Sequence, residues 1–118
     1  MTDDMTPTVP PTMCRTVVYT LSADDAIRIR QARIDRNPIV FGNAGTVHPP
    51  GNEVHAGDLY PAVIIRAWND RLVNLQVLLD GPDSYWATSR PWSPDRADQG
   101  TWAYYPARVE APAVVPGA

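Results

Sequence analysis

The stretch VNLQVLLDGPDSYWATSR, residues 73–90, decides the fold of this chain. Apolar side chains occupy every second position of its first half, which is typical of a strand buried on one face; the alternating residues are Val73, Leu75, Val77 and Leu79. Gly81-Pro82-Asp83 then turns the chain, and residues 84–90 return as a second strand. The stretch therefore predicts a β-hairpin.

The segments on both sides extend this hairpin. Residues 60–68 read as a strand with Pro61 near its start, where proline is tolerated, and residues 69–71 form a tight turn. Residues 91–100 are a polar loop, and TWAYYPA, residues 101–107, predicts a further strand. Short antiparallel strands joined by tight turns make a meander that curls into a small barrel or a half-open sheet.

A strand and one helix precede the meander. Residues 15–21 are rich in β-formers, and Ser22 with Asp25 three positions later approximates a capping box. The helical spacing predicts Ile27 and Ile34 as the buried anchors, with the arginines on the outer face. Asn37-Pro38 ends the helix.

The expected fold is α+β and mostly β: one N-terminal helix plus an antiparallel β-meander that forms a small SH3-like barrel or half-barrel. Residues 15–105 form the single domain, whereas residues 1–14 and 106–118 are extended Pro-rich arms without a core of their own. Residues 39–57 form a Gly/Pro-rich loop with a short strand at 39–41. The chain shows neither a signal peptide nor an apolar run long enough to cross a bilayer.

The charge composition argues against a nucleic-acid partner. The net charge is −3 and the pI about 5.1, so the basic surface of a nucleic-acid binder is missing. All ten cationic side chains are arginines, which suits bidentate contacts at interfaces and also follows from a GC-rich genome. The single cysteine, Cys14, provides no disulfide framework.

Candidate catalytic and metal-binding groups are weak. His48 and His55, with Glu53 and Asp58, match no recurring ligand spacing. Asp80 and Asp83 flank a turn that aspartate commonly forms, and Asp58 is the remaining candidate partner for an acid–base pair. The serines and threonine of the second hairpin strand lack the Gly-x-Ser-x-Gly setting of an exposed nucleophile; they are Ser84, Thr88 and Ser89. We expect no enzyme, no metal site and no cofactor.

The aromatic residues and arginines carry the binding hypothesis, because both are enriched at interface hot spots. Alternation sends Tyr85 and Trp86 to opposite faces of their strand. We expect three tryptophans to fill the core (Trp68, Trp86 and Trp102) and Trp92, beside Arg90, to be an exposed anchor. The predicted interface residues are Arg28, Arg33, Arg66, Tyr85, Arg90, Trp92, Tyr104 and Tyr105.

Three segments carry a resemblance: YTLSADDA at residues 19–26, GNEVHAGDLYPAVIIRAW at residues 51–68, and VNLQVLLDG at residues 73–81. Followed by YWATSR and GTW, they resemble a family of short uncharacterised proteins of actinobacterial tailed phages. The match covers residues 16–105 and omits both arms. The resemblance implies a phage gene product and carries over no catalytic residue.

These observations leave several functions open. The first is a virion accessory protein, a small capsid decoration or minor capsid protein that binds the major capsid protein or another virion protein through its arms and an aromatic and arginine-rich face. It would be made in the host cytoplasm and end in the virion, as a homo-oligomer without nucleic-acid or membrane contacts. The alternatives are an oligomeric binder of a host signalling nucleotide, with phosphates held by arginines, and an inhibitor that docks on a host protein.

Overall fold

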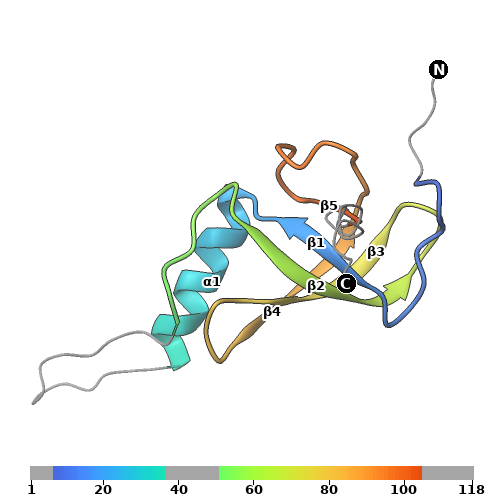
Figure 1. Ribbon diagram of the computed structural model, residues 1–118. Coiled ribbons are helices and arrows are strands. Elements are labelled where there is room, and N and C mark those ends of the chain that lie inside the picture. The colour runs from blue at the N-terminus through green and yellow to red at the C-terminus, as the bar shows by residue number, and fades with distance from the viewer. Residues whose placement is uncertain (1–6, 37–50, 105–118) are drawn as a thin grey trace, which may run out of the picture.

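The computed structural model describes residues 7–36 and 51–104 (Figure 1). Its elements are β1 (Thr16–Thr20), α1 (Ala23–Arg36), β2 (Leu59–Ala67), β3 (Val73–Leu78), β4 (Ser84–Arg90) and β5 (Thr101–Ala103). Within these residues the fold is α+β and mostly β, with a single N-terminal helix, as the sequence predicts. The described helix is too short and too polar to span a membrane.

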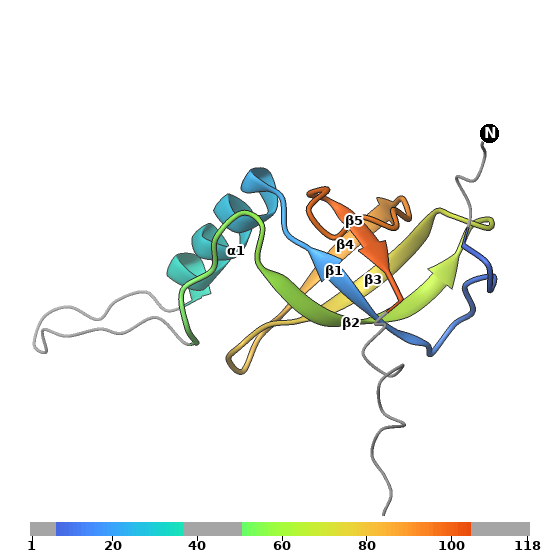
Figure 2. The ribbon, with the colours of Figure 1, turned by 45° about the horizontal axis from the view of Figure 1, so that its top comes forward.

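The five strands form one antiparallel sheet in the order β4-β3-β2-β1-β5. The sheet curls until the chain just after β4 reaches β5 (Figures 1 and 2). There Trp92 and Trp102 form a parallel bridge, and Ser93 N donates to the Trp102 carbonyl oxygen at 3.0 Å. The predicted half-barrel is confirmed, and this bridge links its two edges.

The core lies inside the curl. Every second residue of β3 and its extension is buried, namely Val73, Leu75, Val77 and Leu79, as the alternation predicts. β1 contributes Val17 and Tyr19, and β5 contributes the fully buried Trp102. The indole Nε1 of Trp102 donates to the Arg71 carbonyl oxygen at 2.9 Å, so its one polar atom is satisfied inside the barrel.

A register shift between Ile64 and Arg66 interrupts the pairing of β2 with β3. Such an irregularity breaks the strict alternation of faces. Ile64 is buried, but both Ile65 and Arg66, which follow it directly, are exposed. The end of β2 therefore presents two large consecutive side chains outside the core.

The prediction for the buried face of α1 is wrong. Ile27 and Ile34 are 57% and 60% exposed, whereas the buried helix residues are Asp25, Ala26, Ile29 and Arg33. Asp25 and Arg33, the first and last of these buried residues, are charged, and each is buried against an oppositely charged partner. A search for apolar periodicity does not detect such residues. Arg33, expected on the outer face, is among them.

Two sets of contacts fix α1. The predicted capping box is present, since Ser22 N donates to Asp25 Oδ2 and Asp25 N donates to Ser22 Oγ, both at 3.0 Å. Near its other end, Arg33 forms a bidentate pair with Asp83 in the β3–β4 turn, at 2.7 and 3.0 Å. A Cβ on Gly81 of that turn would lie 2.5 Å from the Gly51 Cα, so only glycine permits this close approach.

Residues 7–14 pack against the barrel. Pro7 and Pro11 are buried, and Cys14 N donates to the Ile64 carbonyl oxygen at 2.8 Å, which extends the β1–β2 pairing. Both ribbon views place this segment beside the end of β2 (Figures 1 and 2). The rest of the predicted arm, the short strand at 39–41, His48, Tyr105 and the tail 106–118 lie outside the described residues.

Candidate functional site

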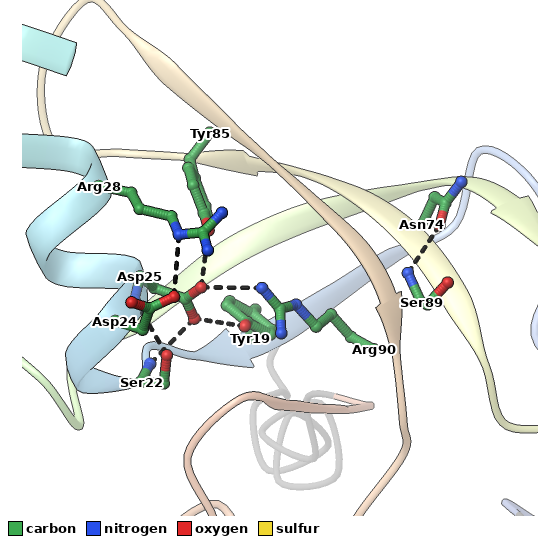
Figure 3. Close-up of polar contacts among 9 residues, drawn as sticks. All are labelled: Tyr19, Ser22, Asp24, Asp25, Arg28, Asn74, Tyr85, Ser89 and Arg90. Atoms are coloured by element: carbon green, nitrogen blue, oxygen red, sulfur yellow. Dashed lines mark hydrogen bonds and ion pairs between the residues drawn. The ribbon is translucent and has the colours of Figure 1, made fainter.

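The seven predicted interface residues that the structure describes do not form one surface. Two of them, Tyr85 and Arg90, converge on the buried carboxylate of Asp25 (Figure 3). Asp25 accepts from Tyr19 Oη at 2.5 Å, Tyr85 Oη at 2.7 Å and Arg90 Nη2 at 2.9 Å, in addition to Ser22 N. We name these five residues the Asp25 cluster: Tyr19, Ser22, Asp25, Tyr85 and Arg90. It joins α1 to β1 and β4.

The electrostatics of the Asp25 cluster follow from this arrangement. Burial raises the pKa of Asp25, but the hydrogen bonds from Tyr19, Ser22 and Tyr85 and the charge of Arg90 outweigh burial and lower it overall. Burial and the hydrogen bond to Asp25 raise the pKa of Tyr85 to about 12 and that of Tyr19 further. The carboxylate is thus ionised and both phenols are protonated at neutral pH, which is a structural arrangement with every acceptor site occupied.

Two arginines of α1, Arg28 and Arg33, are also paired with carboxylates. Arg28 Nε contacts Asp24 Oδ2 at 2.9 Å on the exposed side of the helix. Arg33 is buried against Asp83, and its Nη1 donates to the Asn52 carbonyl oxygen at 2.8 Å. The hydrogen bond from Arg33 and its charge lower the pKa of Asp83. Arg33 also lines a cavity of about 270 Å³ together with Arg30, and Arg90 is not among the residues that line it.

Trp92 and Tyr104 lie together at the other side of the barrel. Trp92 is half-buried and packs against the core, so it is not the fully exposed anchor that its loop predicted. Tyr104 Oη donates to the Val9 carbonyl oxygen at 3.0 Å, and its ring meets Trp102 edge-on at 5.3 Å between centroids. Both residues line a groove of about 290 Å³ beside residues 7–9, which we name the arm groove. Tyr105 is outside the described residues.

An exposed apolar surface lies on the outside of the sheet. Met13 from the N-terminal segment, Ile65 from β2 and Trp86 from β4 surround a shallow groove of about 610 Å³, which we name the outer groove. Trp86 is 61% exposed, and Met13 and Ile65 are exposed as well. The complete lining is Thr12, Met13, Ile65, Arg66, Ala67, Asn74 and Trp86.

Buried Asn74 fixes the rim of the outer groove. Its Oδ1 accepts from Trp68 Nε1 at 3.0 Å and from Ser89 N at 2.7 Å, and Figure 3 shows the second contact. The guanidinium of Arg66 lies 4.1 Å from the centroid of the Trp68 ring. Ser89 adopts a left-handed backbone with φ 53°. Trp68 is therefore held on both its edge and its face while it remains 51% exposed.

The expectation that three tryptophans fill the core is correct only for Trp102. Trp86 pairs with Gln76 on the outer face of the sheet, and Trp68 lies beyond the irregularity in β2. The alternation of β4 contained the signal for Trp86, because its neighbours Tyr85 and Ala87 belong to the inner face. Nothing in the sequence marked Trp68, since its position depends on Asn74 and Arg66.

Among residues 7–36 and 51–104, no group of three or more His, Cys, Asp or Glu side chains is arranged to hold a metal ion. His55 is exposed and lies 3.8 Å from both Glu53 and Asp58. Asp80 accepts from the side chain of Asn52 at 2.8 Å, and Asp83 is paired with Arg33. Asp80 and Asp83 therefore connect the β3–β4 turn to Asn52 and to α1.

Comparison with known proteins adds no family. No protein-family model, no curated protein and no solved structure matches this chain significantly.

Proposed function

We propose that this chain is a small accessory protein of a bacteriophage virion, which docks on a larger capsid protein through the outer groove. The phage assignment rests on the resemblance of residues 16–105 to actinobacterial phage proteins. The observation that carries the docking surface is the gathering of exposed Trp86, Ile65 and Met13 on one side of the sheet.

The composition of the outer groove supports a protein partner. Tryptophan, methionine and arginine are enriched at the centres of protein interfaces, whereas lysine, glutamate and aspartate are depleted there. The groove has no carboxylate in its lining, and its one charge is Arg66. The complementary surface on the capsid protein is an apolar ridge with a carboxylate opposite Arg66.

The rigidity of the rim supports binding as well. The indole of Trp68 is fixed by Asn74 and stacked against Arg66. Because half of its side chain is exposed, burial of Trp68 adds little to the free energy of folding. Ordering such a side chain before association lowers the entropy lost on binding. Trp68 and Arg66 are accordingly presented in a single conformation to the partner.

The nucleotide-binding alternative has less support. Phosphate recognition needs several arginines that point into one cavity. Arg28, Arg33 and Arg90 are instead paired with Asp24, Asp83 and Asp25, and they come from different parts of the surface. Arg30 and Arg33 line one cavity of about 270 Å³, but Arg33 is paired with Asp83. Arg30 donates to the Val54 carbonyl oxygen, and the carboxylate-bearing residue Glu53 lines the same cavity. Arg66 borders the outer groove, which is open and mostly apolar.

Two exposed isoleucines provide a matched test. Ile65 lines the outer groove, whereas Ile27 lies on the exposed face of α1. In binding assays with phage particles that lack the protein, Ile65→Ser weakens binding about tenfold or more, which corresponds to about 1.4 kcal/mol. Ile27→Ser leaves binding unchanged, and the melting temperatures of both variants show that the fold is intact.

Mass spectrometry of purified particles tests the virion assignment separately. The proposal expects the protein at tens to hundreds of copies per particle, roughly one for each capsomer or vertex set. Absence from particles contradicts the virion assignment. Equal binding of the two isoleucine variants contradicts the outer groove as the docking surface.

A further inference from the structure

The arm groove combines a proline-rich segment with two aromatic side chains. Pro7, Thr8 and Val9 contribute to its lining from the N-terminal segment, and Trp92, Pro94 and Tyr104 contribute from the barrel. It shares no lining residue with the outer groove. Inferences about the two grooves are therefore independent.

The segment that runs along this groove has the chemistry of a polyproline ligand. PTVPP, residues 7–11, holds three prolines in five residues and contains the spacing P-x-x-P. Residues 7–12 form neither helix nor strand. Proline fixes φ near the polyproline II value and leaves the main-chain carbonyl groups available to donors outside the segment. The Val9 carbonyl oxygen accepts such a bond from Tyr104 Oη at 3.0 Å.

The barrel holds the receiving side chains in place. Trp102, fully buried, meets the Tyr104 ring edge-on, and the guanidinium of Arg15 lies 5.1 Å from the centroid of the same ring. Trp92 is tied to Trp102 by the bridge that links the sheet edges. Proteins recognise polyproline segments in grooves lined by aromatic side chains. Here Trp92 and Tyr104 line the groove, and the Tyr104 hydroxyl is directed at a main-chain carbonyl.

We propose that the arm groove is a binding site for proline-rich peptides in the polyproline II conformation, and that residues 7–11 of the same chain are its resident occupant. Pro7 is buried and lines the groove, and the Val9 carbonyl oxygen accepts from Tyr104 Oη, so the intramolecular ligand is bound in this structure. A tether of a few residues gives such a ligand an effective concentration of about millimolar or higher. A free proline-rich peptide must therefore compete with the chain's own segment.

This competition determines whether a substitution in the resident segment strengthens or weakens binding of a free peptide. A peptide binds in proportion to the fraction of molecules whose groove is open, so loosening the resident segment strengthens binding of the free peptide. A segment with a purely structural role would not produce that gain. In a chain whose resident segment is already loosened, removing the Tyr104 hydroxyl has the opposite effect, because the free peptide loses a hydrogen bond and little competition remains to be relieved.

The probe is the acetylated and amidated peptide TPTVPPTM, residues 6–13, added to the full ¹⁵N-labelled chain and followed through the indole resonance of Trp92. In the full chain with Pro7→Ala and Pro11→Ala, we expect the apparent dissociation constant to fall at least about threefold relative to wild type. Pro82→Ala, in the exposed β3–β4 turn, is the matched control and leaves the constant unchanged. Adding Tyr104→Phe to the loosened chain raises the constant at least about threefold.

The same titration contains the results that overturn the proposal. These are the absence of peptide binding to the loosened chain, equal binding of a peptide with every proline replaced by alanine, or resonance changes at Trp86 instead of Trp92. If the double variant melts below the assay temperature, the single variant Pro7→Ala carries the same expectation. Failure here leaves the outer groove and the virion assignment untouched, because they are tested on different residues.

Discussion

Tyr85 and Trp86 are neighbours on β4, and the sheet sends their side chains to opposite sides. Tyr85 turns inward and donates its hydroxyl hydrogen bond to Asp25. Trp86 turns outward and is 61% exposed beside the outer groove. The inner residue is polar but has a partner, whereas the outer residue is apolar and is left in water.

Polar groups usually lie outside and apolar groups inside, and these two residues reverse that distribution. The reversal indicates that the inner face stabilises the fold and that the outer face binds a partner. A buried carboxylate is tolerated only when donors replace the water that it has lost, and Asp25 has four such donors. An exposed indole gains nothing from folding and becomes useful when a partner covers it. Changes on the inner face should therefore alter stability, and changes on the outer face should alter binding.

The largest expected effect is the removal of the carboxylate at the centre of the Asp25 cluster. Asp25→Ala leaves the buried hydroxyls of Tyr19 and Tyr85 without their acceptor and the Arg90 guanidinium without its counter-charge. We expect the free energy of unfolding to fall by about 3–5 kcal/mol, measured by urea denaturation. Asp24→Ala is the control, since that carboxylate is exposed and its loss costs less than about 1 kcal/mol. Similar losses in the two variants would contradict the central role of Asp25.

The two neighbours on β4 give the next effect. Tyr85→Phe removes one hydrogen bond to a charged group and costs about 1.5–3 kcal/mol of stability, with particle binding unchanged. Trp86→Thr suits an exposed strand position and alters stability by no more than about 0.5 kcal/mol, yet it weakens particle binding. Urea denaturation and a particle-binding assay, applied to both variants, test the separation. A large loss of stability in Trp86→Thr would show that the outer face also supports the fold.

Alkaline pH tests the Asp25 cluster without removing its carboxylate. The pKa of Tyr85 is raised to about 12, above its ordinary value of 10.0, so the folded state holds this proton more tightly than the unfolded chain does. The stabilising contribution is complete below pH 10 and is lost as the pH rises toward about 12. We expect the urea midpoint of the wild type to fall over this interval, and that of Tyr85→Phe to fall less. Parallel pH profiles for the two proteins would show that Tyr85 has no raised pKa.

The regular parts of the fold could be predicted from the sequence because they depend on local patterns. Alternating valines and leucines placed β3, the Gly-Pro-Asp turn placed β4 beside it, and Ser22 with Asp25 placed the start of α1. The capping box was recognised as a helix start. Its further role was not visible, since the tyrosines and the arginine that reach Asp25 are distant in the chain.

The candidate site was predicted poorly for a related reason. Residue type suggested arginines and aromatics at a surface, but long-range pairing decides which of them remain available. Arg33 is paired with Asp83, fifty positions later in the chain, and Arg90 is paired with Asp25, so neither guanidinium is available to a partner protein. Trp68 and Trp86 were expected to fill the core, but the irregularity in β2 and the alternation of β4 put them outside. Arg66 is the predicted interface residue that lies in the outer groove.

The smallest effect tests the same contrast on the helix. Ile29 is buried against the core, and Ile27, two positions earlier, is exposed. Ile29→Val removes one methylene from a packed site and lowers the free energy of unfolding by about 0.5–1.5 kcal/mol. Ile27→Val removes the same group from water and changes it by less than about 0.5 kcal/mol. Because the two substitutions are chemically identical and share the same helix propensity cost, the difference in their urea midpoints measures burial alone. Equal midpoints would indicate that Ile27 is as buried as Ile29, as its spacing in the sequence predicted.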